Sequence, residues 1–147
     1  MTQRMLEAED AWRALSNTSK KVWKTVNTRL AEMDVSVIEA KVMFMLKKER
    51  RAPMARLSTE LMITPAGATM VADRLEARGL IRRVRSIEDR RVVNVELTRR
   101  GEAKLEKAIK VYNDVIQKVF NGLSHNEVEL LISITDKINA LLESSTF

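Results

Sequence analysis

Arginine dominates the chemistry that this sequence can perform. Nine arginines lie between residues 74 and 100, a span that holds only four acidic residues. The planar guanidinium group donates paired hydrogen bonds to phosphate oxygens and to the edge of guanine. The segment therefore indicates a nucleic acid-binding surface, with a solvated charged face as the alternative from charge alone. The nine residues are Arg74, Arg78, Arg82, Arg83, Arg85, Arg90, Arg91, Arg99 and Arg100.

Residue types needed for most catalysis are scarce. The chain has no cysteine and a single histidine, His125. Disulfides, thiolate zinc sites and thiol redox sensing are thereby excluded, and a histidine metal cluster or a Ser–His pair has almost no room. No nucleophile–base pair and no phosphate-binding glycine loop is present either. We therefore expect no metal and no cofactor, and an enzyme is disfavoured.

Size and composition indicate one ordinary folded chain. It has 147 residues, of which 45% are hydrophobic and 31% charged, and a net charge of +6. This balance argues against wholesale disorder and allows a real core. No apolar run approaches the roughly 18 residues that a membrane helix needs, and the N-terminus lacks a signal-peptide stretch. A cytoplasmic location without a membrane partner is expected.

Helices should dominate, because the chain has only four glycines and two prolines. Apolar periodicity predicts a long first helix, and Ser36 with Glu39 forms a capping box for the second. A connector at residues 52–54 contains Pro53. Thr64 and Pro65 start a further helix that should end at Gly79. The expected helices cover about residues 4–33, 36–48, 55–62, 64–78, 98–121 and 124 onward.

The helix over 64–78 has two distinct faces. Its buried stripe is predicted to be Ala68, Val71, Ala72 and Leu75. After Gly79 the period changes to that of two short strands, 80–85 and 92–97, joined by a charged tip at 86–91. Two adjacent helices followed by such a hairpin describe a mainly α winged helix-turn-helix with a two-stranded β-wing. The opposite, exposed stripe of the helix is Ala66, Thr69, Met70, Asp73, Arg74 and Ala77.

Three runs carry a family resemblance: residues 75–83 (LEARGLIRR), 88–91 (EDRR) and 97–101 (LTRRG). They make the chain similar to the MarR family (multiple antibiotic resistance regulators). The resemblance implies a homodimer whose base is formed by the first and last helices, and binding to pseudo-palindromic promoter DNA. It further implies that small aromatic or phenolic ligands weaken this binding. Residues 1–35 and 102–147 would form the dimerisation region, and 36–101 the DNA-binding domain with a wing at about 80–98.

The resemblance also assigns DNA-binding residues. The recognition helix would be residues 64–78, and Asp89 and Arg91 match an Asp-x-Arg pair that directs the wing arginine towards the minor groove. A carboxylate two residues away can hold a guanidinium in one orientation. The alternative is that the two residues form an ion pair at the hairpin tip that contributes little energy and has no role in DNA binding. Base reading should depend mainly on Thr69, Asp73 and Arg74, or on DNA shape, because the helix starts with side chains that offer no donors. The expected contacts are Thr64, Pro65, Ala66, Gly67, Thr69, Met70, Asp73 and Arg74 on the helix, and Arg83, Arg85, Ser86, Asp89, Arg90 and Arg91 on the wing.

Two further sites are expected outside the DNA-binding surface. Apolar stripes at both ends of the chain exceed what a small winged domain can cover, which favours dimerisation. An aromatic anion could bind near the junction with the dimer base, although packing is the default role of Tyr112. The dimerisation residues are Trp12, Leu15, Val22, Ile132, Ile138 and Leu142. The ligand-binding candidates are Lys20, Trp23, Lys24, Tyr112 and Arg91.

The sequence thus predicts a homodimeric DNA-binding transcriptional regulator, and in particular a repressor. Two alternatives stay open. One is an architectural DNA-binding protein with little sequence preference, and the other is a winged-helix module that binds only proteins. The arginines around the reading surface count against the second.

Overall fold

The computed structural model describes residues 2–144. Residue 1 and residues 145–147, at the ends of the expected dimerisation region, lie outside the described residues. The elements in chain order are α1 (Gln3–Ala31), α2 (Val37–Glu49), β1 (Arg51–Pro53), α3 (Met54–Leu61), α4 (Pro65–Ala77), β2 (Ile81–Arg85), β3 (Val93–Leu97), α5 (Arg99–Phe120) and α6 (His125–Ser144).

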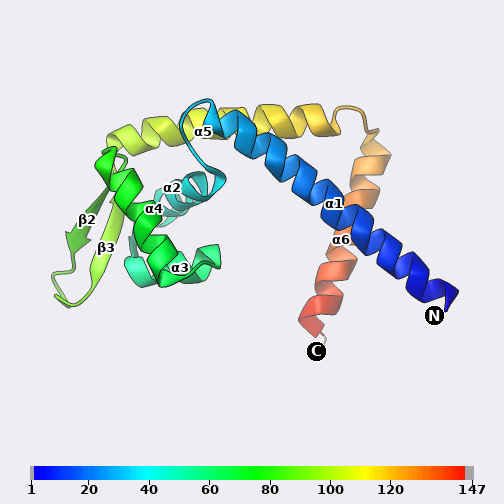
Figure 1. Ribbon diagram of the computed structural model, residues 1–147, viewed down its shortest axis with the longest axis horizontal. Coiled ribbons are helices and arrows are strands. Elements are labelled where there is room, and N and C mark those ends of the chain that lie inside the picture. The colour runs from blue at the N-terminus through cyan, green and yellow to red at the C-terminus, as the bar shows by residue number, and fades with distance from the viewer. Residues whose placement is uncertain (1, 145–147) are drawn as a thin grey trace. The chain divides into compact units, whose positions relative to one another are not determined.

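The chain divides into two compact units, residues 1–113 and 114–147. The first unit contains α1 to β3 and most of α5 (Figure 1). The second contains the end of α5 and the whole of α6. No helix within residues 2–144 combines the length and the apolar character needed to cross a membrane.

The mainly α winged helix-turn-helix is confirmed, with one correction to its sheet. Residues 52–54 were expected to form a connector, but residues 51–53 form strand β1, which pairs antiparallel with β3 and makes the sheet three-stranded in the order β1-β3-β2. Pro53 fits because an edge strand leaves one side of its backbone unpaired, so the missing N–H costs no ladder bond. Ala52 is fully buried, and α3 starts at once with Met54.

Local capping signals fix several helix ends. The Ser36 side chain accepts a hydrogen bond from the Glu39 amide (3.2 Å), and the Glu39 carboxylate accepts one from the Ser36 amide (2.8 Å). Gly79 adopts the left-handed conformation that was expected after α4, with φ of 68°. Gly101 is required for packing, because a Cβ there would collide with the carbonyl oxygen of Leu80.

The core of the first unit lies where α2, α3, α4, the sheet and α5 meet. The predicted buried stripe of α4 is confirmed, since all four of its residues belong to this core. Because that stripe is fixed inward, the opposite side of α4 faces solvent beside the β2–β3 hairpin (Figure 1). The largest fully buried side chains include Met43, Leu46, Leu57, Leu75 and Ile81.

Candidate nucleic-acid interface

Helix α4 presents an exposed face that its first turn holds in place. The Thr64 side chain accepts a hydrogen bond from the Gly67 amide (3.0 Å), and Pro65 occupies the first helical position. A Cβ at residue 67 would lie 3.2 Å from Thr64 Oγ1, so glycine leaves room for this cap. Pro65 and Ala66 are exposed and Gly67 is half-buried. The start of α4 is thus accessible but carries few donors, as the sequence indicated.

Further along α4, the exposed face is mixed in chemistry. Met70 is 64% exposed and offers an apolar surface. Thr69 is exposed, and its hydroxyl donates a hydrogen bond to the Pro65 carbonyl oxygen (3.0 Å). This hydroxyl keeps only its acceptor capacity for a ligand. Asp73 and Arg74 are exposed as well, so the residues expected to read bases share one accessible face.

Arg83 on β2 joins the hairpin to α4. Its guanidinium donates hydrogen bonds to Asp73 (2.6 Å) and to Glu76, and its main-chain amide donates to Glu76 (3.0 Å). Burial opposes the charge on Arg83, but the hydrogen bonds with Asp73 and then Glu76 outweigh it, so the pKa of the guanidinium is raised. Arg83 and Asp73, both expected to contact DNA, therefore bind each other.

Two further arginines bind one glutamate on the sheet. Glu96 on β3 is buried between Arg51 on β1 and Arg82 on β2, which lie opposite it in the strand register. Arg82 donates hydrogen bonds to Glu96 at 2.9 and 2.7 Å, and Arg51 Nε donates another at 2.6 Å. The hydrogen bonds from Arg82 and then Arg51 lower the pKa of the Glu96 carboxyl group. Through this one carboxylate, the two arginines link the edge strands β1 and β2 to the central strand β3.

The hairpin tip is shaped by main-chain contacts. Asp89 accepts a hydrogen bond from the Arg91 amide on its side chain (2.9 Å) and one from the Val92 amide on its carbonyl oxygen (3.0 Å). Ser86 Oγ accepts a weaker one from the Asp89 amide (3.3 Å). The expectation that Asp89 holds the Arg91 guanidinium needs correction, since a carboxylate at this spacing in a turn reaches the amide first. Asp89 orders the loop, and this leaves the guanidinium free to point outward.

Three cations around the tip stay unpaired. Arg85, Arg90 and Arg91 are exposed, and within residues 2–144 none of them forms an ion pair with an acidic side chain. The arginines nearer the core, by contrast, are compensated by buried or half-buried carboxylates. The tip of the hairpin therefore offers positive charge to a partner, and so does the start of α5, where Arg99 and Arg100 are exposed and form no ion pair within residues 2–144.

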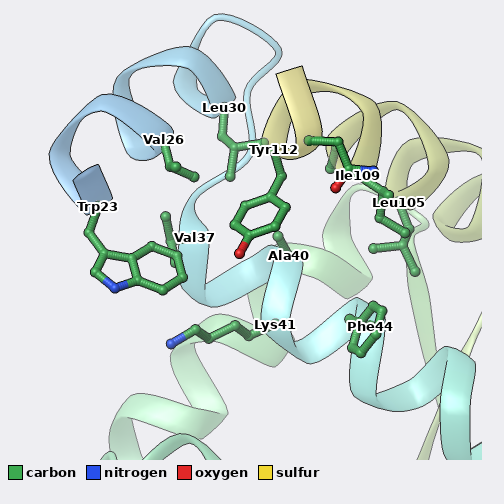
Figure 2. A pocket seen from close by; sticks show the side chains of 12 residues that line it. Trp23, Val26, Leu30, Val37, Ala40, Lys41, Phe44, Leu105, Ile109 and Tyr112 are labelled. Carbon is green, nitrogen blue, oxygen red and sulfur yellow. The ribbon is translucent and has the colours of Figure 1, made fainter. Parts of the chain in front are cut away.

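A cavity of about 370 Å³ lies in the first unit between α1, α2 and α5 (Figure 2). Trp23 and Tyr112 both line it, with their ring centroids 6.3 Å apart. The ammonium group of Lys41 lies 4.9 Å from the centre of the Trp23 ring. Apart from Asn113, the remaining walls are apolar and are formed by Val26, Leu30, Val37, Ala40, Phe44, Leu105, Ala108 and Ile109.

Only part of the expected ligand site gathers there. Trp23 and Tyr112 line the cavity, whereas Lys20, Lys24 and Arg91 do not. Lys20 and Lys24 are exposed on α1, and Arg91 lies at the hairpin tip. Lys41 and Phe44 also line the cavity but were not among the residues predicted from the sequence. Their spacing from Val37 and Ala40, one helical face after the Ser36 cap, is the signal that could have found them.

The residues expected at the dimer interface lie on two helices with exposed apolar surfaces. On α1, Trp12 is 66% exposed, Leu15 is exposed and Val22 is half-buried. On α6, no described residue is buried, and Ile132, Ile138 and Leu142 are all exposed. A lone chain thus leaves long apolar stripes in water.

Comparison with known proteins identifies relatives of this architecture. Residues 35–93 match the model of the MarR family. The chain is 29% identical to the uncharacterized HTH-type transcriptional regulator YhbI of Bacillus subtilis, over 91% of this chain and 85% of that protein. It is 33% identical to the transcriptional repressor MprA of Escherichia coli, over 60% of this chain and 51% of that protein. Its fold is similar to that of a mutant E. coli MarR complexed with operator DNA, with a TM-score of 0.77 and 23% identity over 93% and 99% of the two chains.

Proposed function

The chain belongs to the MarR family through residues 35–93, its winged helix-turn-helix region, and on this premise we propose that it is a homodimeric repressor of pseudo-palindromic promoter sites. Members of this family are transcriptional regulators and not enzymes. Residues 36–101 would bind DNA, and residues 1–35 and 102–147 would form the dimer. A regulator of this kind acts on the chromosome, so we propose a cytoplasmic location.

The main support for the proposal is that unpaired, exposed arginines lie next to the exposed face of α4. The exposed face of α4 and the unpaired Arg85, Arg90 and Arg91 belong to adjoining elements, since the Arg83 contacts tie β2 to α4. The major groove is about 12 Å wide and admits a helix, while a narrow minor groove attracts arginine. We therefore propose that α4 enters the major groove and that Arg90 and Arg91 bind the adjacent minor groove or phosphates.

Exposed apolar side chains on α1 and on α6 support the proposed dimer. An isolated chain would expose Trp12, Ile132, Ile138 and Leu142 together with several other large apolar side chains on α1 and α6. Contiguous exposed apolar patches of this kind mark interfaces. A symmetric dimer would also present two recognition helices, as a pseudo-palindrome requires. Repression is the role in the name of the relative MprA, and we propose it for this chain.

The cavity supports regulation by a small aromatic or phenolic anion. Three aromatic rings, from Trp23, Phe44 and Tyr112, and the cation of Lys41 in a mostly apolar cavity are the groups that such a ligand would use. The ligand could weaken DNA binding only by binding the DNA-incompetent form more tightly, and DNA would weaken ligand binding equally. A ligand there would act by changing the spacing of the two recognition helices, whose half-sites lie about 34–36 Å apart.

Footprinting on the DNA upstream of the gene tests the proposal against its alternatives. A sequence-specific repressor protects a discrete pseudo-palindrome and binds it at least about 10³-fold more tightly than random DNA. An architectural protein binds both DNAs with similar affinity. A protein-interaction module protects no site, and any weak electrostatic binding to either DNA disappears as salt is raised.

A further inference from the structure

Glu39 lies between α2 and the recognition helix, with its side chain only 7% exposed. Its Oε1 atom is 3.6 Å from Arg74 Nε, and its Oε2 atom is 3.6 Å from Arg78 Nη1. Oε2 also accepts the capping hydrogen bond from Ser36 (2.8 Å). One buried carboxylate therefore caps α2 and faces two arginines of the element that would read DNA.

The two arginines differ in what else holds them. Arg78 is 26% exposed and also forms an ion pair with Asp34 (3.2 Å), so its guanidinium is enclosed at the end of α4. Arg74 is 57% exposed, and within the described residues its one ion pair is with Glu39. Glu39 thus restrains the one cation on the exposed face of α4. A long, charged side chain that is restrained in this way enters a groove with less loss of rotamer freedom.

We propose that Glu39 is a positioning residue that orients Arg74 for base recognition, and so determines base preference without touching DNA. The inference rests on the proposed DNA-binding function. It assigns the direction of Arg74 to a residue on α2, outside the recognition helix. The Ser36 amide donates a hydrogen bond to Oε2 of Glu39, and this holds in place the carboxylate that forms ion pairs with Arg78 and Arg74.

The capping role of Glu39 can be separated from this positioning role. Glutamine also serves at the third position of a capping box, so Glu39→Gln keeps the cap and removes the charge that attracts Arg74. The chain supplies a matched control in Glu127, which forms the same box with Ser124 on α6. Glu127 is exposed and pairs with no arginine among the described residues. Glu127→Gln therefore reports any general effect of the exchange.

The experiment is selection of binding sites from a random DNA duplex library by the full chain and by the variants Glu39→Gln, Glu127→Gln and Arg74→Ala. Glu39→Gln should lose preference at the same base positions as Arg74→Ala, by about tenfold or more per position. Glu127→Gln should select the parental motif. Adding Glu39→Gln to Arg74→Ala should change nothing further, because Glu39 acts through Arg74.

Selection of the parental motif by Glu39→Gln, with unchanged preference at every position, would overturn the proposal. So would altered preference at positions that Arg74→Ala leaves intact. Thermal unfolding of each variant checks folding. If Glu39→Gln does not fold, Glu39→Met removes the charge and the cap together and must give the motif change of Arg74→Ala, while Glu127→Met, which removes the equivalent cap on α6, must select the parental motif. Failure of the parental chain to enrich any motif would instead refute the DNA-binding function on which the inference rests.

Discussion

Arg83 Nη2 donates a 2.6 Å hydrogen bond to Asp73 Oδ1, and this contact joins the first strand of the hairpin to the exposed face of the recognition helix. The same guanidinium binds Glu76. The wing and the helix are consequently held as one body, which a protein needs if it is to place both in neighbouring grooves. Arg83 is thus occupied by two carboxylates, and its expected contact with DNA stays a prediction.

Arg83 and Arg85 should separate stability from DNA binding. Arg83→Ala removes the guanidinium that binds Asp73 and Glu76 but keeps the main-chain hydrogen bond to Glu76, so we expect the free energy of unfolding to fall by about 1 kcal/mol. Arg85→Ala removes an exposed, unpaired side chain and should change stability by less than about 0.5 kcal/mol while weakening DNA binding. Urea unfolding and fluorescence anisotropy with labelled DNA measure the two effects. Equal stability of the two variants would contradict the proposed role of Arg83.

Arg91→Ala should weaken binding to most DNA sequences. An unpaired arginine at the hairpin tip contributes mainly electrostatic binding, so the slope of log affinity against log salt should flatten by about 0.9 for one lost phosphate contact. Anisotropy titrations at several salt concentrations provide the slope. Lys110→Ala, an exposed charge change on α5, is the control. Unchanged affinity and slope for Arg91→Ala would show that the wing is wrongly assigned.

Ile138→Glu and Leu142→Glu should each disrupt the dimer. Both side chains are exposed in the lone chain and lie on the apolar stripe of α6, where a buried charge would be strongly unfavourable. Sedimentation velocity should show a shift from dimer to monomer or to aggregates. Lys137→Ala, an exposed position that helical period places away from Ile132, Ile138 and Leu142, should remain dimeric. A parental chain that is a well-folded monomer and binds DNA at full affinity would exclude this interface.

The cavity should bind salicylate, which should reduce DNA binding. Tyr112→Ala and Lys41→Ala should blunt this response more than they reduce DNA affinity, because both residues line the cavity. Lys24→Ala is the matched control, since Lys24 is an exposed lysine that does not line it. Titration of the protein–DNA complex with salicylate, benzoate and a non-aromatic acid at matched ionic strength tests this. Equal effects of all three acids would indicate salt competition and no aromatic site.

Glu96 should make stability depend on pH in the acid range. Because the hydrogen bonds from Arg82 and Arg51 lower its pKa in the folded state, its contribution is present above the ordinary pKa of about 4.5. The contribution is lost as pH falls through the lower folded value. Glu96→Gln should therefore lower the free energy of unfolding by about 1–2 kcal/mol at pH 7 and by much less near pH 3. A difference that is independent of pH would rule out this ionic role.

Sequence patterns predicted the features that depend on neighbours in the chain. The Ser36 cap, the inward stripe of α4 and the left-handed Gly79 were predictable because each follows from residues a few positions apart. Strand β1 was missed because Pro53 argues against a strand unless the strand lies at an edge, and edge position is a tertiary property.

The candidate site was only partly predictable for the same reason. The cluster of arginines was visible in the sequence, but its division into paired and unpaired members was not, because the partners of Arg83 and Arg74 come from other elements. Helical spacing places Lys41 on one face with Val37 and Ala40, but its contact with Trp23 depends on the packing of α2 against α1, which local spacing does not reveal.

We propose that two copies of this chain bind the two half-sites of one DNA site. The decisive measurement is the affinity for the selected or footprinted site with and without five base pairs inserted between its halves. Such an insertion rotates one half-site by about half a helical turn, so a dimer can no longer seat both recognition helices. We predict a loss of affinity of at least about 100-fold. Equal affinity for the two DNAs would show that the chain does not bind both half-sites as a dimer.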